Sequence, residues 1–392
     1  MFYQTVRAGL KKINWIVLAV KAFRLFWKRS ADYVSYICLF VKIVYTKKGK
    51  KSVAFFEPNP YHAETFVGYA KYFIDAGYLV HVILDKEIEK ENPFCRFVSP
   101  MFQVFYIKLT VPLVERISGG CLLNNYSHIL ITSSVCYRSG SEINIQELLS
   151  VKNGKKTFFV EHDLDNIDKF HENDIAKENR LWTLLGRTSY SNMQTVMVNP
   201  NFYGSVSFPC YNKDIVNFIA IGVGKKEYRN YGLLENAANK LVESGISKIN
   251  ISIVGYRYNQ NEMNNSVINY CGRLRFDEMY KEIEKSCYLL FLLDPNVEGN
   301  KRYLRRVVTG SFQLALGFRI IPILDRTYAE AYGLNDNNAI IYEHNDLFSG
   351  MRTAMQLKEE EYVSRQRELG NYARAISNVS MENVKKAIGY DC

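Results

Sequence analysis

The stretch NFIAIGVGKKEYRNYGLLENAANKLVESGISKINISIVG, residues 217–255, switches between two hydrophobic periods. Residues 217–222 and 249–255 are short apolar runs typical of buried strands. Residues 231–245 lie between them with apolar side chains at helical spacing, and Gly245 follows the last helical residue. Strand, helix and strand in this order indicate two parallel strands joined by a covering helix. The stretch therefore predicts an α/β fold with a parallel sheet.

The same alternation continues in both directions along the chain. Toward the C-terminus we expect helices over 275–287 and 309–317 and strands over 288–293 and 320–324. Toward the N-terminus the pattern predicts a helix over 67–77 and four strands, over 52–57, 79–85, 128–132 and 157–161. A chain of 392 residues is too long for one typical core, so two doubly wound domains are expected.

The alternation is interrupted at residues 207–214, which contain Pro209 and show no periodicity. We place the domain boundary there. The predicted parts are a leader (1–50), an N-terminal Rossmann-like domain (51–209), a C-terminal Rossmann-like domain (210–360) and a helical C-terminal segment (361–392).

The net charge of +10 is concentrated in the leader. Residues 1–51 hold twelve Lys and Arg and one acid, Asp32, whereas the rest of the chain has 38 bases and 39 acids. A nucleic-acid enzyme usually carries basic charge on its globular body, so nucleic acid is not expected as a partner. The eight cysteines are far apart and match no metal-ligand or disulfide pattern, which fits a reducing cytoplasm.

The leader combines apolar and aromatic residues with bases at helical spacing, Lys21, Arg24 and Lys28. The uncharged run Ile13–Val20 is too short to span a bilayer, which needs about 20 apolar residues. One interpretation is a basic amphipathic segment that binds an anionic membrane surface. The other interpretation is a pair of helices packed on the body, with the aliphatic stems of the Lys side chains buried and their ammonium groups in water. The two interpretations are compatible. We expect a cytoplasmic protein, peripheral on the inner face of the cell membrane.

Ionisable residues follow the strand over 157–161 in the sequence FFVEHDLDNID, residues 158–168. Open α/β sheets bind ligands at the carboxyl ends of their strands. His162 stands at such an end, and a neutral imidazole can both donate and accept a hydrogen bond. The alternative is a surface turn in which His162 has no ligand.

These motifs resemble those of bacterial GT-B glycosyltransferases that build capsule, O-antigen or lipopolysaccharide sugars, within the broad superfamily of the family 4 retaining enzymes. The likeness covers residues 52–380 and is strongest over 217–345. It implies two Rossmann-like domains facing across a cleft, with the acceptor in the first and a nucleotide-sugar donor in the second. It also implies that His162, which precedes Asp163 and Leu164 as in many members, contacts hydroxyls of the donor sugar.

The resemblance places two further candidate catalytic residues in PNPYHAETFVGYAKYF, residues 58–73. GT-B enzymes use this loop near the reacting carbon, and His62 or Glu64 could take a proton from the acceptor hydroxyl. Alternatively, Glu64 only stabilises the N-terminus of the following helix through its charge.

The resemblance implies a nucleotide-binding turn in AIGVGKKEYRNYGLLENA, residues 220–237. Gly222 fits the family glycine, and Arg229 and Asn230 occupy the place of a Lys-Asn pair. The usual arginine after the glycine is missing, because Val223 stands there. Lys226, or its neighbour Lys225, could substitute. A fixed cation here would stabilise the departing nucleoside diphosphate.

The remaining predicted binding residues come from residues 270–280 and 292–318. Arg273 could contact phosphate or base, and Gly310 and Ser311 open a helix whose N–H groups can hold phosphate. Glu298 matches the first of two glutamates that the family often has. The second is absent, since its place falls at Phe312, and this departure puts the ribose-binding carboxylate in doubt.

The sequence predicts a glycosyltransferase of the hexosyltransferase type that transfers a sugar from a UDP- or GDP-linked donor to a lipid-linked or growing surface glycan. No cofactor besides this co-substrate and no metal are expected. Retention of the anomeric configuration is favoured by His162 and its neighbours. The alternatives are a nucleotide-sugar 2-epimerase of the same fold and a non-catalytic polysaccharide-assembly protein.

Overall fold

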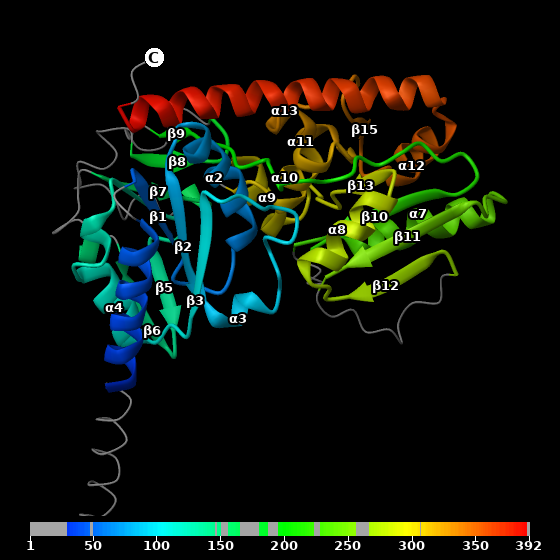
Figure 1. The fold of residues 1–392 in the computed structure, drawn as a ribbon. Helices are drawn as coiled ribbons and strands as arrows, with labels where there is room; N and C mark the ends of the chain where they lie inside the picture. The colour runs from blue at the N-terminus through cyan, green and yellow to red at the C-terminus, as the bar shows by residue number, and fades with distance from the viewer. Residues whose placement is uncertain are drawn as a thin grey trace, which may run out of the picture.

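The computed structural model describes residues 30–47, 50–145, 147–149, 156–164, 180–186, 195–222, 228–255, 266–305 and 307–389. These residues form two α/β domains that lie side by side, each with one parallel sheet and helices on both faces (Figure 1). The predicted fold class, two Rossmann-like domains, is confirmed.

The first domain contains a seven-stranded sheet in the order β3-β2-β1-β4-β7-β8-β9, and all its strand pairs are parallel. The strands are β1 (Ser52–Phe56), β2 (Leu79–Asp85), β3 (Phe102–Ile107), β4 (His128–Ile131), β7 (Thr157–Val160), β8 (Leu181–Thr183) and β9 (Val196–Met197). β1 is buried along its whole length, as a strand covered on both faces must be.

Helices cover both faces of this sheet. They are η1 (Ala63–Thr65), α2 (Phe66–Asp75), α3 (Lys86–Glu89), α4 (Val111–Gly119), η2 (Leu123–Asn125) and a helix over residues 30–47. The helix over 30–47 packs Tyr36, Leu39 and Ile43 into the same core as α4. Part of the predicted leader is therefore a helix packed on the body. Residues 1–29 lie outside the described residues.

An antiparallel hairpin of β5 (Val135–Arg138) and β6 (Ser141–Asn144) follows β4. It was not predicted, because its strands are only four residues long and Tyr137, Ser141 and Glu142 are exposed. Such short, half-polar strands have little hydrophobic periodicity.

The second domain contains a six-stranded parallel sheet in the order β12-β11-β10-β13-β14-β15. Its strands are β10 (Val216–Ile221), β11 (Ile249–Val254), β12 (Ile268–Gly272), β13 (Tyr288–Leu290), β14 (Ile321–Asp325) and β15 (Ile340–Tyr342). Its helices are α7 (Tyr231–Glu243), α8 (Phe276–Lys285), α9 (Glu298–Arg305), α10 (Gly310–Phe318), α11 (Arg326–Ala331) and α12 (Leu347–Gln356).

The long helix α13 (Glu359–Ala387) runs across both domains (Figure 1). Near its start, the Tyr362 hydroxyl donates to the Cys287 carbonyl of the second domain at 3.2 Å. Near its end, Ser380 accepts a hydrogen bond from the Asn199 N–H at 2.9 Å, and Val384 enters the core of the first domain. The predicted C-terminal segment is therefore one helix that ties the domains together. Among the described residues, no helix is both long enough and apolar enough to cross a bilayer.

Candidate active site

The carboxyl ends of the two sheets meet around a cavity of about 490 Å³ that residues of both domains line. Seven predicted site residues line this cavity, which we call the interdomain cavity: His62, Glu64, His162, Gly222, Arg229, Gly310 and Ser311. They lie up to 249 positions apart in the chain, so the fold brings together groups that the sequence separates. Among the described residues, no group of three or more His, Cys, Asp or Glu side chains is placed to hold a metal ion.

Arg229 is a buried cation at the second domain's side of the interdomain cavity, with 6% of its surface exposed. Its guanidinium donates from Nη2 to the Thr309 hydroxyl at 2.9 Å and from Nη1 to the Tyr228 carbonyl at 2.9 Å. Its Nε atom is buried and has no hydrogen-bond partner among the described residues. No carboxylate of the described residues forms an ion pair with it, and a buried charge without a counter-ion is costly. The site is therefore suited to an anion.

The N-terminus of α10 faces the same space. Thr309 caps the helix and accepts a hydrogen bond from the Ser311 N–H at 3.4 Å. A side chain added at Gly310 would meet no atom within 4 Å, so the backbone there is open to the cavity. The N–H groups of a first helical turn have no partners within the helix and favour negative charge. Arg229 and the N-terminus of α10 therefore present positive charge to the same cavity, an arrangement suited to a phosphate or diphosphate.

Gly222 directly follows β10 and lies beside Arg229. A Cβ atom at this position would lie 3.0 Å from the Arg229 Nε. Its φ of +153° also disfavours other residues. A larger residue at position 222 would push the Arg229 side chain away from its place at the cavity, and glycine avoids this contact.

Two histidines stack on the first domain's side of the interdomain cavity. The rings of His62 and His162 lie 4.2 Å apart at an angle of 13°. Burial lowers the pKa of His62 to about 4 and the pKa of His162 well below its ordinary value, so both rings are neutral at neutral pH. The His162 Nε2 is buried and has no hydrogen-bond partner among the described residues, which leaves it available to a ligand.

Glu64 lies in η1 on the same side and lines the interdomain cavity with Tyr203. Burial raises the pKa of the Glu64 carboxyl. Its charge in turn raises the pKa of the neighbouring Tyr203, after the larger effect of burial. A cavity-lining carboxyl with a raised pKa is a candidate for proton transfer.

Two other predicted residues, Asn230 and Arg273, lie outside the interdomain cavity. The Asn230 side chain caps α7 by accepting from the Leu233 N–H at 2.9 Å, and its amide donates to Asp294 at 2.8 Å. Arg273 is exposed and pairs with Glu91 at 2.7 Å. Neither of these two side chains lines the interdomain cavity. Lys226 lies outside the described residues, as does Lys225.

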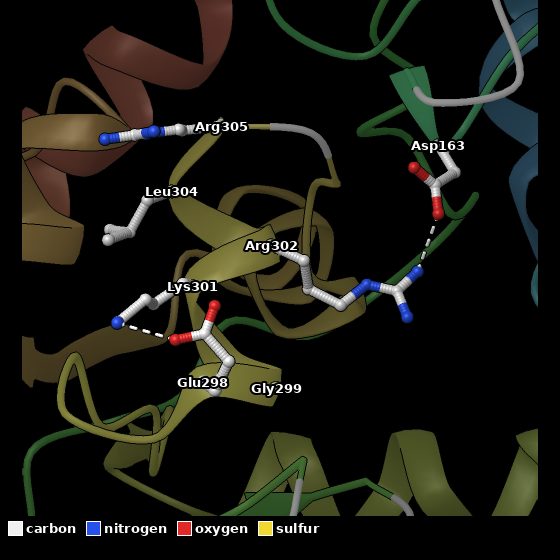
Figure 2. A pocket seen from close by; sticks show the side chains of 7 residues that line it. All are labelled: Asp163, Glu298, Gly299, Lys301, Arg302, Leu304 and Arg305. Atoms are coloured by element: carbon white, nitrogen blue, oxygen red, sulfur yellow. Dashed lines mark hydrogen bonds and ion pairs between the residues drawn. The ribbon is translucent and has the colours of Figure 1, made fainter.

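Glu298 lines a second, neighbouring cavity of about 600 Å³ at the start of α9 (Figure 2). Its carboxylate pairs with Lys301 at 2.6 Å. On the other side of this cavity, Arg302 reaches from α9 to Asp163 of the first domain at 2.8 Å. Asp163 also forms an isolated β-bridge with Val307, so the segment after His162 contacts the second domain directly.

Gln313 is a cavity residue that the sequence does not reveal. Phe312, the position at which a glutamate was sought, is fully buried and stacks on Tyr332 with ring centroids 4.8 Å apart. Gln313 follows it and lines the interdomain cavity, with 3% of its surface exposed. Both polar atoms of its amide lack a hydrogen-bond partner among the described residues. A neutral amide that can donate and accept suits hydroxyl groups of a ligand.

Comparisons with known proteins identify the fold. No family model matches the chain, and no curated protein matches it. Among solved structures it is similar to an α-glucosyltransferase in complex with UDP and a 13-mer DNA (13% identity, TM-score 0.57, covering 86% of this chain and 99% of the other). It is also similar to TarM (9%, 0.53, 86% and 98%). A third match, from E. coli, is described as trehalose-6-phosphate bound with UDP-2-fluoro glucose (11%, 0.50, 86% and 99%).

These neighbours place the chain in the GT-B fold of glycosyltransferases. At identities of 13% or less they show the fold and nothing finer. Whether this chain transfers a sugar must be argued from its own residues.

Proposed function

We propose that the protein is a glycosyltransferase that takes a sugar from a nucleotide-sugar donor. The observation that carries this proposal is the unpaired Arg229, buried beside the N-terminus of α10 in the interdomain cavity. A nucleoside diphosphate supplies the missing negative charge, and the fixed cation stabilises the charge that develops as the glycosidic bond breaks. The UDP and UDP-sugar bound to two structural neighbours support a donor of this class.

The sugar of the donor would lie between the diphosphate site and the first domain. There it meets the unpartnered Gln313 amide on one side and the unpartnered His162 Nε2 on the other. Each group can bind a hydroxyl, and neither carries a charge that would compete for phosphate. Glu64 and His62 line the same cavity. We propose that they contact the acceptor or the leaving group next to the donor sugar.

We further propose that the acceptor is a lipid-linked or growing surface glycan and that the protein works at an anionic membrane surface. The helix over 30–47 has an apolar face that the body leaves uncovered. It comprises Tyr33, Val34, Ile37, Val41, Val44 and Tyr45, each 43–73% exposed. Residues 1–51, to which this face belongs, carry a net charge of +11. Apolar residues on a basic segment favour binding to anionic lipid.

Incubation of the full chain with UDP- and GDP-linked hexoses tests the proposal. We expect release of nucleoside diphosphate that is slow with water and faster with a glycolipid acceptor, without added metal. Formation of an epimeric nucleotide sugar would instead support the 2-epimerase alternative. A parallel reaction with DNA in place of the glycolipid tests DNA as the acceptor, because DNA is present in the complex of the α-glucosyltransferase neighbour. The anomeric configuration of the product tests whether the enzyme retains the configuration of the donor.

Absence of both turnover and nucleotide binding would contradict the proposal. Nucleotide binding without turnover for any donor and acceptor would support the non-catalytic alternative.

A further inference from the structure

A third cavity, of about 260 Å³, lies behind the histidine pair and is lined mainly by the first domain, with Arg302 and Val307 contributed by the second. It shares His62 and His162 with the interdomain cavity, so the two rings stand between them. The turn after β4 lines it with three consecutive hydroxyls, Thr132, Ser133 and Ser134. We call it the hydroxyl cavity. A group bound there would lie next to the site in which we place the donor sugar.

Glu57 lies directly behind the hydroxyl cavity, at the carboxyl end of β1, and no part of it is exposed. Its Oε1 accepts a hydrogen bond from the Asn59 N–H at 2.7 Å. Its Oε2 accepts from the Thr132 hydroxyl at 2.6 Å and from the Ser133 hydroxyl at 2.8 Å. Ser133 is half-buried and lines the cavity, whereas Thr132 is only 1% exposed. The Ser133 hydroxyl therefore connects the cavity with the buried carboxylate.

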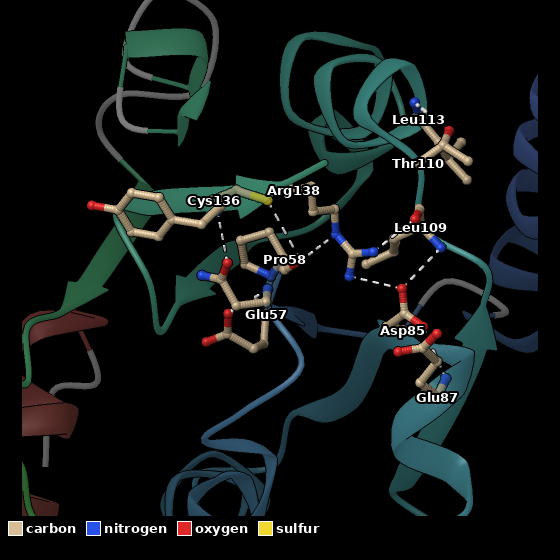
Figure 3. Close-up of polar contacts among 11 residues, drawn as sticks. Glu57, Pro58, Asp85, Glu87, Leu109, Thr110, Leu113, Cys136 and Arg138 are labelled. Carbon is tan, nitrogen blue, oxygen red and sulfur yellow. Dashed lines mark hydrogen bonds and ion pairs between the residues drawn. The ribbon is translucent and has the colours of Figure 1, made fainter. Parts of the chain in front are cut away.

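No cation neutralises Glu57 among the described residues. Arg138, which contacts the carbonyl of the adjacent Pro58 at 3.0 Å, pairs with Asp85 at 2.7 Å and not with Glu57 (Figure 3). Burial raises the pKa of Glu57 to about 7, and the three hydrogen bonds only partly oppose this effect. The titratable groups that feel its charge are Tyr61 and Cys136, both of which are neutral at neutral pH because burial raises their pKa values.

We propose that the acceptor hydroxyl binds in the hydroxyl cavity and passes its proton through Ser133 to Glu57. This inference rests on the proposed function. As the acceptor oxygen forms its bond to the sugar carbon, its O–H bond breaks and the proton goes to the Ser133 oxygen. The Ser133 proton moves to the Glu57 carboxylate at the same time. The bond from the sugar carbon to phosphate breaks, and its electron pair leaves with the nucleoside diphosphate.

The relay works only when the Glu57 carboxylate is ionised. It therefore predicts a specific dependence of the rate on pH. Below pH 7 the carboxyl is increasingly protonated and the rate should fall about tenfold per pH unit. A glutamine at this position keeps the size of the side chain but accepts no proton. The acid limb of the pH profile should therefore vanish together with most of the rate.

The test measures the release of nucleoside diphosphate by the full chain from pH 5 to pH 9. The probe is whichever UDP- or GDP-linked hexose reacts fastest, with water as the acceptor. We expect Glu57→Gln and Ser133→Ala to lower kcat on the order of a hundredfold and to remove the acid limb, with little change in KM. Thr132→Val removes the other hydroxyl on the same carboxylate oxygen, whose hydrogen bond lowers the pKa of Glu57, so this variant should move the acid limb to higher pH without removing it.

The two proposals fail in different ways. A Glu57→Gln protein that turns over at the wild-type rate with the wild-type pH profile overturns the relay and leaves the glycosyltransferase standing. A wild-type protein that releases no nucleoside diphosphate from any donor at any pH overturns both. Melting temperatures of all variants, recorded on the same samples, separate lost chemistry from lost folding.

Discussion

At the scale of single residues, the cavities are defined by polar groups that the folded chain leaves without partners. Arg229, Gln313 and His162 each keep a buried polar atom unsatisfied among the described residues. Such an atom costs on the order of 1–3 kcal/mol when nothing binds it. Three side chains with such atoms around one cavity indicate that a ligand supplies the missing contacts, as is typical of functional sites.

His162 should act on the sugar more than on folding. We expect His162→Ala to lose on the order of a hundredfold in kcat, about 2.7 kcal/mol of barrier, because a hydroxyl contact made in the transition state is lost. Nucleotide affinity should stay near the wild-type value, since the diphosphate site is on the other domain. Turnover and melting temperature measured on one preparation decide this. A mutant that melts several degrees lower but keeps its activity per folded molecule would make His162 a structural residue.

Glu57 should cost stability at neutral pH. Its pKa is raised from 4.5 to about 7 in the folded state, so its contribution to stability is fully present below pH 4.5 and is lost as the pH rises through 7. Glutamine does not titrate. The free energy of unfolding of Glu57→Gln relative to wild type should therefore increase by about 2–3 kcal/mol between pH 5 and pH 8.

Urea unfolding at both pH values measures this difference. A constant difference would show that Glu57 is not the buried, unneutralised carboxyl described above. We expect Glu57→Gln to be more stable than wild type at pH 8 and to have lower turnover. Such a trade-off between stability and activity is typical of catalytic residues.

The sequence could predict Arg229 as a cavity residue through the family resemblance, and Ser311 because small residues at a helix start leave N–H groups that can hold phosphate. It could not predict Gln313. Choosing between Phe312 and Gln313 requires knowing which face of α10 packs on Tyr332, and this depends on the rotation of the helix in the fold. Glu57 was missed for a similar reason, since its three donors come from two loops that meet only in the folded domain.

At the scale of elements, the strongly periodic segments were predicted to within a few residues. The expected strand over 79–85 is β2 as observed, and the helix over 231–245 is α7, which ends at Glu243. Hydrophobic periodicity specifies such elements because their burial is uniform. β8 and β9 are two or three residues long and depend on pairing with neighbours, so no local pattern reveals them.

The close packing of α10 against Asn201 and Tyr203 can be tested by replacing Gly317 of this helix. A Cβ atom at Gly317 would lie 2.3 Å from the Tyr203 ring and 2.9 Å from the Asn201 carbonyl oxygen. Gly317→Ala should therefore destabilise the protein by about 1–3 kcal/mol through overpacking, although alanine favours helices.

Gly232→Ala is the matched comparison. It also lies in a helix, α7, but its nearest neighbour would be 3.6 Å away, so it should be neutral or stabilising by up to about 1 kcal/mol. Denaturant unfolding of both variants checks the pair. Equal effects at the two positions would contradict the close approach of α10 to Tyr203.

At the scale of the whole molecule, α13 and the Asp163–Arg302 pair join two domains whose facing edges form the interdomain cavity. The helix over 30–47 adds an apolar surface on the first domain, beside α4 (Figure 1). This arrangement would let one face of the molecule rest on a membrane while the second domain binds a soluble donor. The predicted domain boundaries at residues 50, 209 and 360 stay predictions.

The apolar face should bind anionic bilayers. Replacing Val34, Ile37 and Val41 with serine removes exposed side chains and leaves the buried Tyr36, Leu39 and Ile43 in the core, so folding should be kept. We expect full-length wild type to pellet with vesicles containing anionic lipid and the triple variant to pellet severalfold less. Val98→Ser, at an exposed site outside this helix, is the control. Equal pelleting of wild type and triple variant would contradict a role of this face.

The central claim is that the interdomain cavity holds a nucleoside diphosphate through Arg229. Calorimetric titration of the full chain with UDP and with GDP tests it directly. We predict that at least one nucleotide binds and that Arg229→Ala weakens it tenfold or more, since a charge-assisted contact is worth about 1.5–3 kcal/mol. Arg273→Ala should change the Kd less than twofold, because Arg273 is exposed and pairs with Glu91. An unchanged Kd for Arg229→Ala, or no nucleotide binding by the wild type, would contradict the account.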